Sequence, residues 1–390
     1  RGGFPSWGGS KTNRLFLIWG VKIESAKTPS YAICAINLDV MIFLGAMFVI
    51  GESMQKSGYL LFLFNRIFGK AGNLDQLLLL ILFAMGFLSA LLMNDTLAII
   101  GTPLMLYLAR TLKIAPKLLL LTLAFAITIG SALSPIGNPQ NLLIAVNAKL
   151  SNPFLVFLQH LLLPTVTNLL LAYLLLRLFY KEEFQSRSLQ ICREEVSDPA
   201  LARLSRLSII LLLALILAKI GAIVLGDGGG FRLTYIALIS ALPILLFSNK
   251  RYEIMRNIDW CTLIFFAAMF VLMESVWRSG IFQSLLAGSE ADLASIPTIL
   301  ALSVLISQLI SNVPFVALCQ PLLINPSPEA LMALAAGSTI AGNLFILGAA
   351  SNVIIIQNAE KSGETLTFLE FARLGVPLTL LNVLVYWLFL

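Results

Sequence analysis

Side chains that bind transition metals or form disulfides are scarce in this chain of 390 residues. It has one histidine, His160, and its four cysteines are far apart with no C-x-x-C pair. Neither a disulfide framework nor a thiolate metal motif is therefore indicated, and one imidazole does not suggest a zinc or iron site. We expect no resident cofactor. The cysteines are Cys34, Cys192, Cys261 and Cys319.

Charge is scarce as well. Only 12% of the residues are Asp, Glu, Lys or Arg, whereas an ordinary soluble domain has about 25%. The chain is 58% hydrophobic, and its mean hydropathy is +0.92. Apolar runs close to the roughly 20 residues that cross a bilayer as a helix recur from Leu38 to Leu390. These features argue against a large soluble helical core and predict an all-α polytopic protein of the inner or plasma membrane.

The positive charge does not indicate a nucleic-acid partner. The net charge is +6, but the basic residues are scattered through short segments between apolar runs, as topology signals are and phosphate-binding patches are not. No Walker A motif occurs, so we do not expect the chain to hydrolyse ATP, although a partner ATPase remains compatible with it. The sequence also offers no nucleophile–base pair or metal cluster that would suggest a membrane enzyme.

Polar, small and helix-breaking residues interrupt the apolar sequence twice in each half of the chain. The first half has Asn94-Asp95-Thr96 and then a run from Gly130 to Asn141 that includes Ser134-Pro135-Ile136-Gly137-Asn138-Pro139-Gln140-Asn141. The second half has Ser311-Asn312-Val313-Pro314 and then a run from Ala341 to Asn352. Irregular backbone at membrane depth is tolerated where it is buried in protein or lines a cavity. Paired interruptions in two halves are typical of a transporter's binding site.

The distribution of Lys and Arg predicts how the chain crosses the membrane. The two halves come out with opposite orientation, as two inverted-topology repeats, each with a re-entrant helical hairpin and a broken transmembrane helix. An N-terminal segment, 1–36, contains one weak further span that Lys22, Glu24 and Lys27 interrupt; whether it crosses the membrane stays open. The predicted parts are repeat 1 at 37–180 with hairpin 75–112 and broken helix 118–150, a cytoplasmic linker at 181–206, and repeat 2 at 207–390 with hairpin 294–325 and broken helix 329–358.

The four interruptions supply the candidate binding residues. A half-helix that begins inside the membrane directs free N–H groups and its positive dipole end toward an anion. None of the four motifs contains Arg or Lys, which favours a small, weakly charged anion held by backbone and amide donors. Carbonyl and side-chain oxygens there suit a hard cation, and we place a candidate Na⁺ site at Asn94, Asp95 and Asn312. The full set is Asn94, Asp95, Thr96, Ser134, Pro135, Gly137, Asn138, Pro139, Asn141, Ser311, Asn312, Val313, Pro314, Gly348, Ser351 and Asn352.

Asp95 is the most informative single residue. A carboxylate in the middle of a membrane is costly unless it is paired, protonated or bound to an ion. We expect Asp95 to titrate or to ligate a cation during transport. The alternative is a helix N-cap that accepts from Leu97 or a neighbouring N–H group, and both roles can hold together.

The motifs resemble those of the ion transporter superfamily that contains arsenite-efflux permeases, citrate permeases and divalent-anion/sodium symporters. The resemblance covers about residues 37–390, and the Pro135–Asn141 run is most similar to the arsenite-permease-like branch. It implies a scaffold domain and a transport domain, a homodimer and an elevator-like movement. The sodium-coupled members have Ser-Asn-Thr at both hairpin tips, and each tip of this chain keeps part of that pattern.

The sequence and the resemblance together predict a secondary active permease for a small anion or oxyanion, either arsenite-like or a carboxylate or inorganic anion, driven by Na⁺ or H⁺. A sodium/proton antiporter of the same superfamily is the alternative, although Asp95 is nearly alone as a central carboxylate. A channel is disfavoured because the internal repeat with hairpins argues for alternating access.

Overall fold

A computed structural model describes residues 34–148, 150, 152–184, 197–225, 232–281, 284, 295–323 and 325–390. The described part is helical throughout and contains no strand. The expected weak first helix therefore lies almost wholly outside the described residues. The helices of the first half are α3 (Leu38–Lys56), α4 (Tyr59–Phe68), α5 (Leu74–Leu92), α6 (Asn94–Leu112), α7 (Pro116–Ser131), α8 (Pro139–Asn147), α9 (Pro153–Phe179) and the 3₁₀ turn η1 (Lys181–Phe184).

The second half repeats this order of long and interrupted helices. Its elements are α10 (Pro199–Val224), α11 (Leu233–Phe247), α12 (Arg251–Asn257), α13 (Trp260–Ser279), α15 (Ile296–Ile310), α16 (Asn312–Cys319), η2 (Gln320–Leu322), α17 (Pro328–Ile340), η3 (Ala341–Asn343), η4 (Ile346–Gly348), α18 (Ala350–Glu360) and α19 (Phe368–Phe389). Helix α10 begins at Pro199, within the predicted linker 181–206.

Six of the described helices are long and apolar enough to cross a bilayer: α3, α5, α9, α10, α13 and α19. The prediction of an all-helical, multi-pass membrane protein is confirmed. Both arms of the first hairpin have 19 residues, about 28 Å at 1.5 Å per residue. That length approaches the roughly 30 Å of the hydrocarbon core, so helix length alone does not separate a re-entrant hairpin from two spans.

Asparagine and proline explain where many of these helices begin. The side-chain oxygens of Asn37, Asn73, Asn138 and Asn152 each accept a hydrogen bond from the backbone N–H three residues later. An N-cap of this kind satisfies one of the N–H groups that a helix leaves free at its start. Proline, whose fixed φ suits the first turn, opens α7, α8, α9 and α17.

Two close helix pairs hold the interrupted helices in place. A Cβ atom added to Gly130 of α7 would lie 2.2 Å from the Gly86 carbonyl oxygen of α5. One added to Gly337 of α17 would lie 2.8 Å from Cβ of Ser303 on α15. The first arm of each hairpin thus packs against the first arm of the following broken helix through glycine, which lets the backbones approach.

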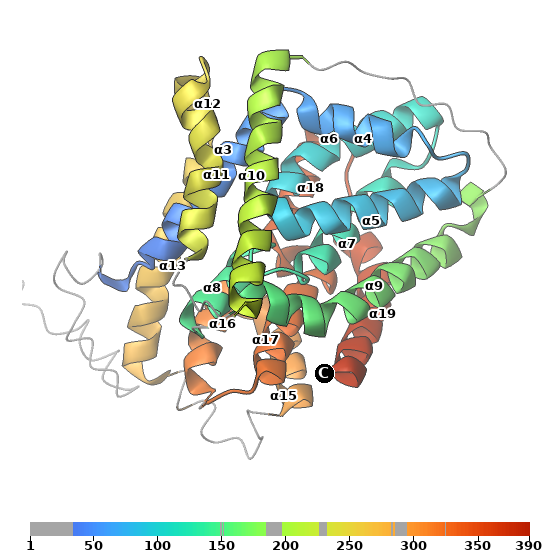
Figure 1. The fold of residues 1–390 in the computed structure, drawn as a ribbon. Coiled ribbons are helices and arrows are strands. Elements are labelled where there is room, and N and C mark those ends of the chain that lie inside the picture. The colour runs from blue at the N-terminus through green and yellow to red at the C-terminus, as the bar shows by residue number, and fades with distance from the viewer. Residues whose placement is uncertain are drawn as a thin grey trace, which may run out of the picture.

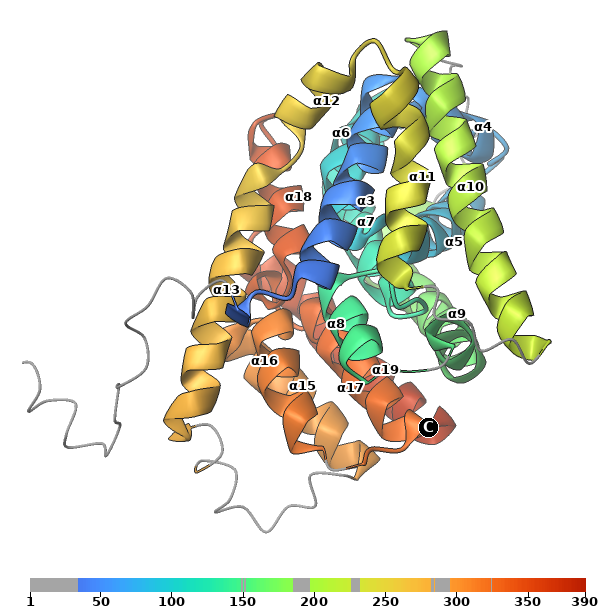
Figure 2. The same ribbon diagram turned by 60° about the vertical axis from the view of Figure 1, so that its left-hand side comes forward.

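The helices form two groups. In Figures 1 and 2, α3, α10, α11 and α13 run roughly lengthwise along one side, and the hairpins and broken helices lie beside them. Helix α4 and hairpin α5–α6 lie toward one end of the molecule, and α15–α17 lie toward the other. This placement agrees with hairpins that enter from opposite faces, and opposite membrane orientation of the two halves stays a prediction.

Candidate functional site

The tips of the two hairpins share one backbone conformation. Met93 has φ 69° and ψ 143°, and Ser311 has φ 70° and ψ 163°. In each hairpin the second helix then begins at an asparagine, Asn94 or Asn312. Asn94 therefore corresponds to Asn312, and the first break falls at Met93, one residue before the motif that the sequence singles out. Non-glycine residues in such conformations cost about 1–3 kcal/mol and are typically found at functional sites.

Asn94 connects the first tip to both broken helices. Its backbone N–H donates to the Gly137 carbonyl oxygen at 3.0 Å, and its side-chain amide donates to Ser351 Oγ at the start of α18, at 3.4 Å. Its side-chain oxygen accepts from the Asp95 N–H at 3.1 Å. One residue thus joins hairpin α5–α6, the α7–α8 junction and α18.

The α7–α8 junction is held by two asparagines whose amide groups are fully engaged. Asn138 donates to Ser131 Oγ and to Thr339 Oγ1, each at 3.1 Å. Asn141 donates to the carbonyl oxygens of Ser131 and Ser134, each at 3.1 Å. Both asparagines are completely buried. They shape the junction and leave no amide hydrogen for a ligand.

The remaining candidate residues of this junction also have structural contacts. Ser134 Oγ accepts from the Ile136 N–H at 3.2 Å. A Cβ atom on Gly137 would lie 2.2 Å from the Ser131 carbonyl oxygen, so only glycine fits there. Pro139 is the first residue of α8, and Pro135 is buried.

The α17–α18 junction is built in a similar way around Asn352. Its amide donates to the Gly342 carbonyl oxygen at 2.6 Å. A Cβ atom on Gly348 would lie 2.6 Å from the Ala341 carbonyl oxygen, so this position also requires glycine. The two junctions differ in burial, because residues 132–138 are all buried whereas Leu347 of the second junction is 71% exposed.

Four further polar residues belong to this centre; Asn343 lies in the interrupted run from Ala341 to Asn352, and the other three were not selected from the sequence. Gln308 donates to the Ala341 carbonyl oxygen at 2.8 Å, and Asn343 donates to Asn382 Oδ1 at 3.0 Å. Thr339 completes the bridge between Asn138 and α17. The signal that could have found them is a lone amide or hydroxyl in an apolar helix, which is rare at membrane depth.

Within the described part of the chain, several oxygens at the second tip and junction accept no hydrogen bond. Among the described residues, Asn312 Oδ1, Asn352 Oδ1 and Gln308 Oε1 are buried without a donor. A buried acceptor of this kind costs about 1–3 kcal/mol unless it is satisfied. Carbonyl-type oxygens are the ligands that hard cations prefer, and they also accept from the hydroxyl groups of a protonated oxyanion.

Asp95 lies in the first turn of α6 and is buried, with 7% of its surface exposed. Among the described residues no basic side chain forms an ion pair with it. Helix α6 begins before Asp95 and has no side-chain cap, so the alternative that Asp95 is an N-cap is wrong. The helix dipole favours a carboxylate at this position.

The other tip residues are arranged around these groups. Thr96 faces the lengthwise helix α3, because a Cβ atom on Gly51 would lie 2.6 Å from Thr96 Cγ2. Val313 and Pro314 are buried in the first turn of α16.

In the part of the chain that the structure describes, no group of three or more His, Cys, Asp and Glu residues is placed to hold a metal ion.

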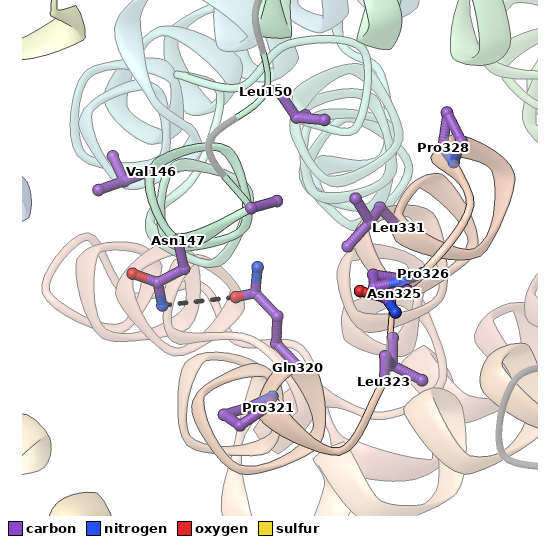
Figure 3. A pocket seen from close by; sticks show the side chains of 11 residues that line it. Val146, Asn147, Leu150, Gln320, Pro321, Leu323, Asn325, Pro326, Pro328 and Leu331 are labelled. Carbon is purple, nitrogen blue, oxygen red and sulfur yellow. Dashed lines mark hydrogen bonds between the residues drawn. The ribbon is translucent and has the colours of Figure 1, made fainter.

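A separate cavity of about 840 Å³ lies at the opposite ends of the two short helices α8 and α16. Figure 3 shows Asn147 and Gln320 facing each other on its wall, joined by a 3.5 Å hydrogen bond. None of its lining residues belongs to the predicted set. Helix α8 carries Asn138 at its start and Asn147 at its end, so it connects the polar centre with this cavity.

Comparison with known proteins gives consistent matches. Residues 15–330 match the family CitMHS, described as citrate transporter. A 46 kDa membrane protein of Mycobacterium leprae is 27% identical over 372 residues, which cover 89% of this chain and 84% of the relative. The human P protein is 25% identical over 438 residues, and the match spans only 52% of its length.

A similar fold occurs in a solved structure. The crystal structure of the YdaH transporter of Alcanivorax borkumensis, described as having an unusual topology, superposes with a TM-score of 0.58. The match covers 97% of this chain and 88% of that chain, at 16% sequence identity. At this identity the likeness concerns the fold.

Proposed function

The chain belongs to the citrate transporter family, and from this premise we propose that it is a secondary active transporter of a small anion in the cell membrane. Membership of this family makes it a multi-pass membrane transporter. In this proposal a carboxylate or a small inorganic oxyanion crosses by an elevator-like movement that an ion gradient drives.

The observation that carries the proposal is the convergence at Asn94. This residue contacts both the α7–α8 junction and α18, while Thr339 bonds to Asn138 across the halves. Four helix starts, those of α6, α8, α16 and α18, belong to these tips and junctions. Their N-terminal N–H groups favour an anion, and the acceptor oxygens of Asn312 and Asn352 favour a cation beside it.

We expect the described motifs to hold a weakly charged substrate. The tips and junctions contain amides, hydroxyls and one carboxylate but neither Arg nor Lys. A multiply charged anion would need cationic partners, which here a co-bound Na⁺ would supply.

The test is uptake into liposomes that contain the purified protein, with imposed sodium or proton gradients and a panel of citrate, succinate, sulfate, arsenite and antimonite. We expect one gradient to drive one panel member. We expect this flux to be at least tenfold lower in the Asn312→Ala variant than in wild type. Asn358→Ala is the matched control, because Asn358 lies at the far end of α18 and accepts from Lys361.

A sodium/proton antiporter is the second candidate, and the buried carboxylate of Asp95 favours it. In that case sodium would exchange for protons with no panel anion present, and Asp95→Asn would abolish the exchange while leaving the melting temperature unchanged. Anion flux that survives in Asp95→Asn with the same pH dependence would remove Asp95 from the coupling step under either function.

A further inference from the structure

An apolar groove of about 470 Å³ runs along the lengthwise helices, away from the polar centre. Its floor is α3, one wall is α11, the other wall is α13, and α12 closes one end. Figure 2 shows α3 between α11 and α13, with α12 connecting their ends. The lining is apolar and includes Met41, Gly45, Ala46, Val49, Met255 and Trp260.

The floor of the groove is open because of small residues. A Cβ atom added to Gly45 would meet no other atom within 4 Å, and the next residue is Ala46. From Met41 to Val49 the floor extends over eight residue steps, about 12 Å. One leaflet of the hydrocarbon core is about 15 Å deep, so the groove matches the depth that an acyl chain of one leaflet occupies.

Basic and aromatic side chains surround the end that α12 closes. Arg251 lies one turn before the lining residue Met255 on α12, and Arg256 lies in the last turn of the same helix. Residues four apart share one helix face. The Arg251 guanidinium lies 5.3 Å from the centre of the Tyr252 ring, and Tyr252 is 79% exposed. Trp and Tyr beside Arg are typical of the depth of lipid headgroups.

The acidic groups near this end already have partners. Glu253 pairs with Lys56 at 2.5 Å, and Asp198 pairs with Lys250 at 2.7 Å. Asp259 accepts from the Thr262 hydroxyl at 2.5 Å. Among the described residues neither Arg251 nor Arg256 forms an ion pair, and both are exposed.

We propose that this groove is a binding site for one anionic phospholipid, with an acyl chain between α11 and α13 and its phosphate at Arg251 and Arg256. A phosphate accepts charge-assisted hydrogen bonds from Arg. A second copy of the chain is a poorer occupant. An interface of two copies through this groove, related by an axis along the membrane normal, would gather both pairs of arginines at one depth, where like charges repel.

The test is native mass spectrometry of the purified, delipidated protein after addition of phosphatidylglycerol or phosphatidylcholine with the same acyl chains. We expect wild type to retain phosphatidylglycerol in preference to phosphatidylcholine. Gly45→Phe fills the groove and should abolish retention of both lipids. Gly221→Phe is the matched control, since Gly221 of α10 is equally open but does not line the groove.

The headgroup is tested separately, so the proposal stays falsifiable if Gly45→Phe folds poorly. Arg251→Gln and Arg256→Gln should each weaken the preference for phosphatidylglycerol about fivefold, and Arg66→Gln on α4 should leave it unchanged. Unchanged lipid retention in Gly45→Phe would overturn the proposal. The proposal would also be overturned if Gly45→Phe retained both lipids and changed from dimer to monomer, because the groove would then be an interface between copies.

Discussion

At the scale of single residues, the asparagines of the polar centre divide by what their amide groups do. Asn138 and Asn141 use their N–H groups to bind backbone and hydroxyl oxygens. Asn312 and Asn352 each have a buried side-chain oxygen that accepts no hydrogen bond within the described residues. The first pair maintains the shape of a junction, and the side-chain oxygens of the second pair are available to a bound ion or substrate.

This division predicts that the substitution of Asn by Asp has a large effect on stability at one position and a small effect at the other. Asn141→Asp replaces an amide donor by a carboxylate that faces the carbonyl oxygens of Ser131 and Ser134. Two lost hydrogen bonds and a buried charge should lower the stability by at least about 3 kcal/mol. Asn312→Asp keeps the acceptor oxygen, replaces the amide nitrogen by a second oxygen, and should leave the melting temperature within a few degrees while changing ion dependence. Thermal unfolding in detergent, together with liposome flux, measures both; equal loss of stability would contradict the division.

At the scale of helices, contact between α5 and α7 depends on the absence of two side chains. Gly130→Ala would place a methyl group against the Gly86 backbone and should destabilise the protein by about 1–3 kcal/mol through overpacking. Gly221→Ala in α10 meets open space and should instead stabilise the helix by about 0.5–1 kcal/mol. Thermal unfolding of the two variants checks the opposite signs, and a stabilised Gly130→Ala would show that the helices can separate at little cost.

At the same scale, the side chain of Asp198 stabilises the start of helix α10. Asp198 accepts from the N–H groups of Ala200 and Leu201 and pairs with Lys250. These hydrogen bonds, the one from Leu201 first, hold the pKa of Asp198 below its ordinary value. A lowered carboxyl pKa stabilises the fold at pH values above the unfolded pKa of about 3.9. This stabilisation is lost as the pH falls through the lower pKa of the folded state.

We therefore expect Asp198→Ala to lower stability at neutral pH by about 1 kcal/mol, the usual value of an N-cap. The difference from wild type should begin to shrink at about pH 4 and disappear once the pH is below the lowered folded pKa of Asp198. Asp198→Ser retains a capping oxygen without the ion pair and should recover most of the loss at pH 7. A difference that persists undiminished in acid would assign the effect to packing.

At the scale of the whole molecule, the proposed movement requires the hairpin tip to slide past α3. A Cβ atom on Gly51 would lie 3.6 Å from Cβ of Thr96, within the 3.5–4.5 Å that a disulfide spans. In a background without the native cysteines, Gly51→Cys with Thr96→Cys should form a disulfide under oxidation. We expect oxidation to stop flux and a reductant to restore it. The single variants are the controls, and full flux in the oxidised protein would rule out relative movement of α3 and the first hairpin.

The sequence by itself determined the class of the protein and the positions of its interruptions. Apolar length and low charge require a helical membrane protein, and Asn, Gly and Pro locate each break within about two residues because they act on the local backbone. Local chemistry does not decide which distant groups meet. Asn94 contacts Ser351, 257 positions away, and Thr339 contacts Asn138, 201 positions away.

Tertiary structure alone therefore decided what each polar residue does. It assigned Asn138 and Asn141 to the junction, placed Asp95 inside a helix rather than at its cap, and brought Gln308 and Thr339 into the centre. The physical reason is that a buried amide is satisfied by whichever donors and acceptors packing brings within about 3 Å. That packing depends on helices from both halves of the chain.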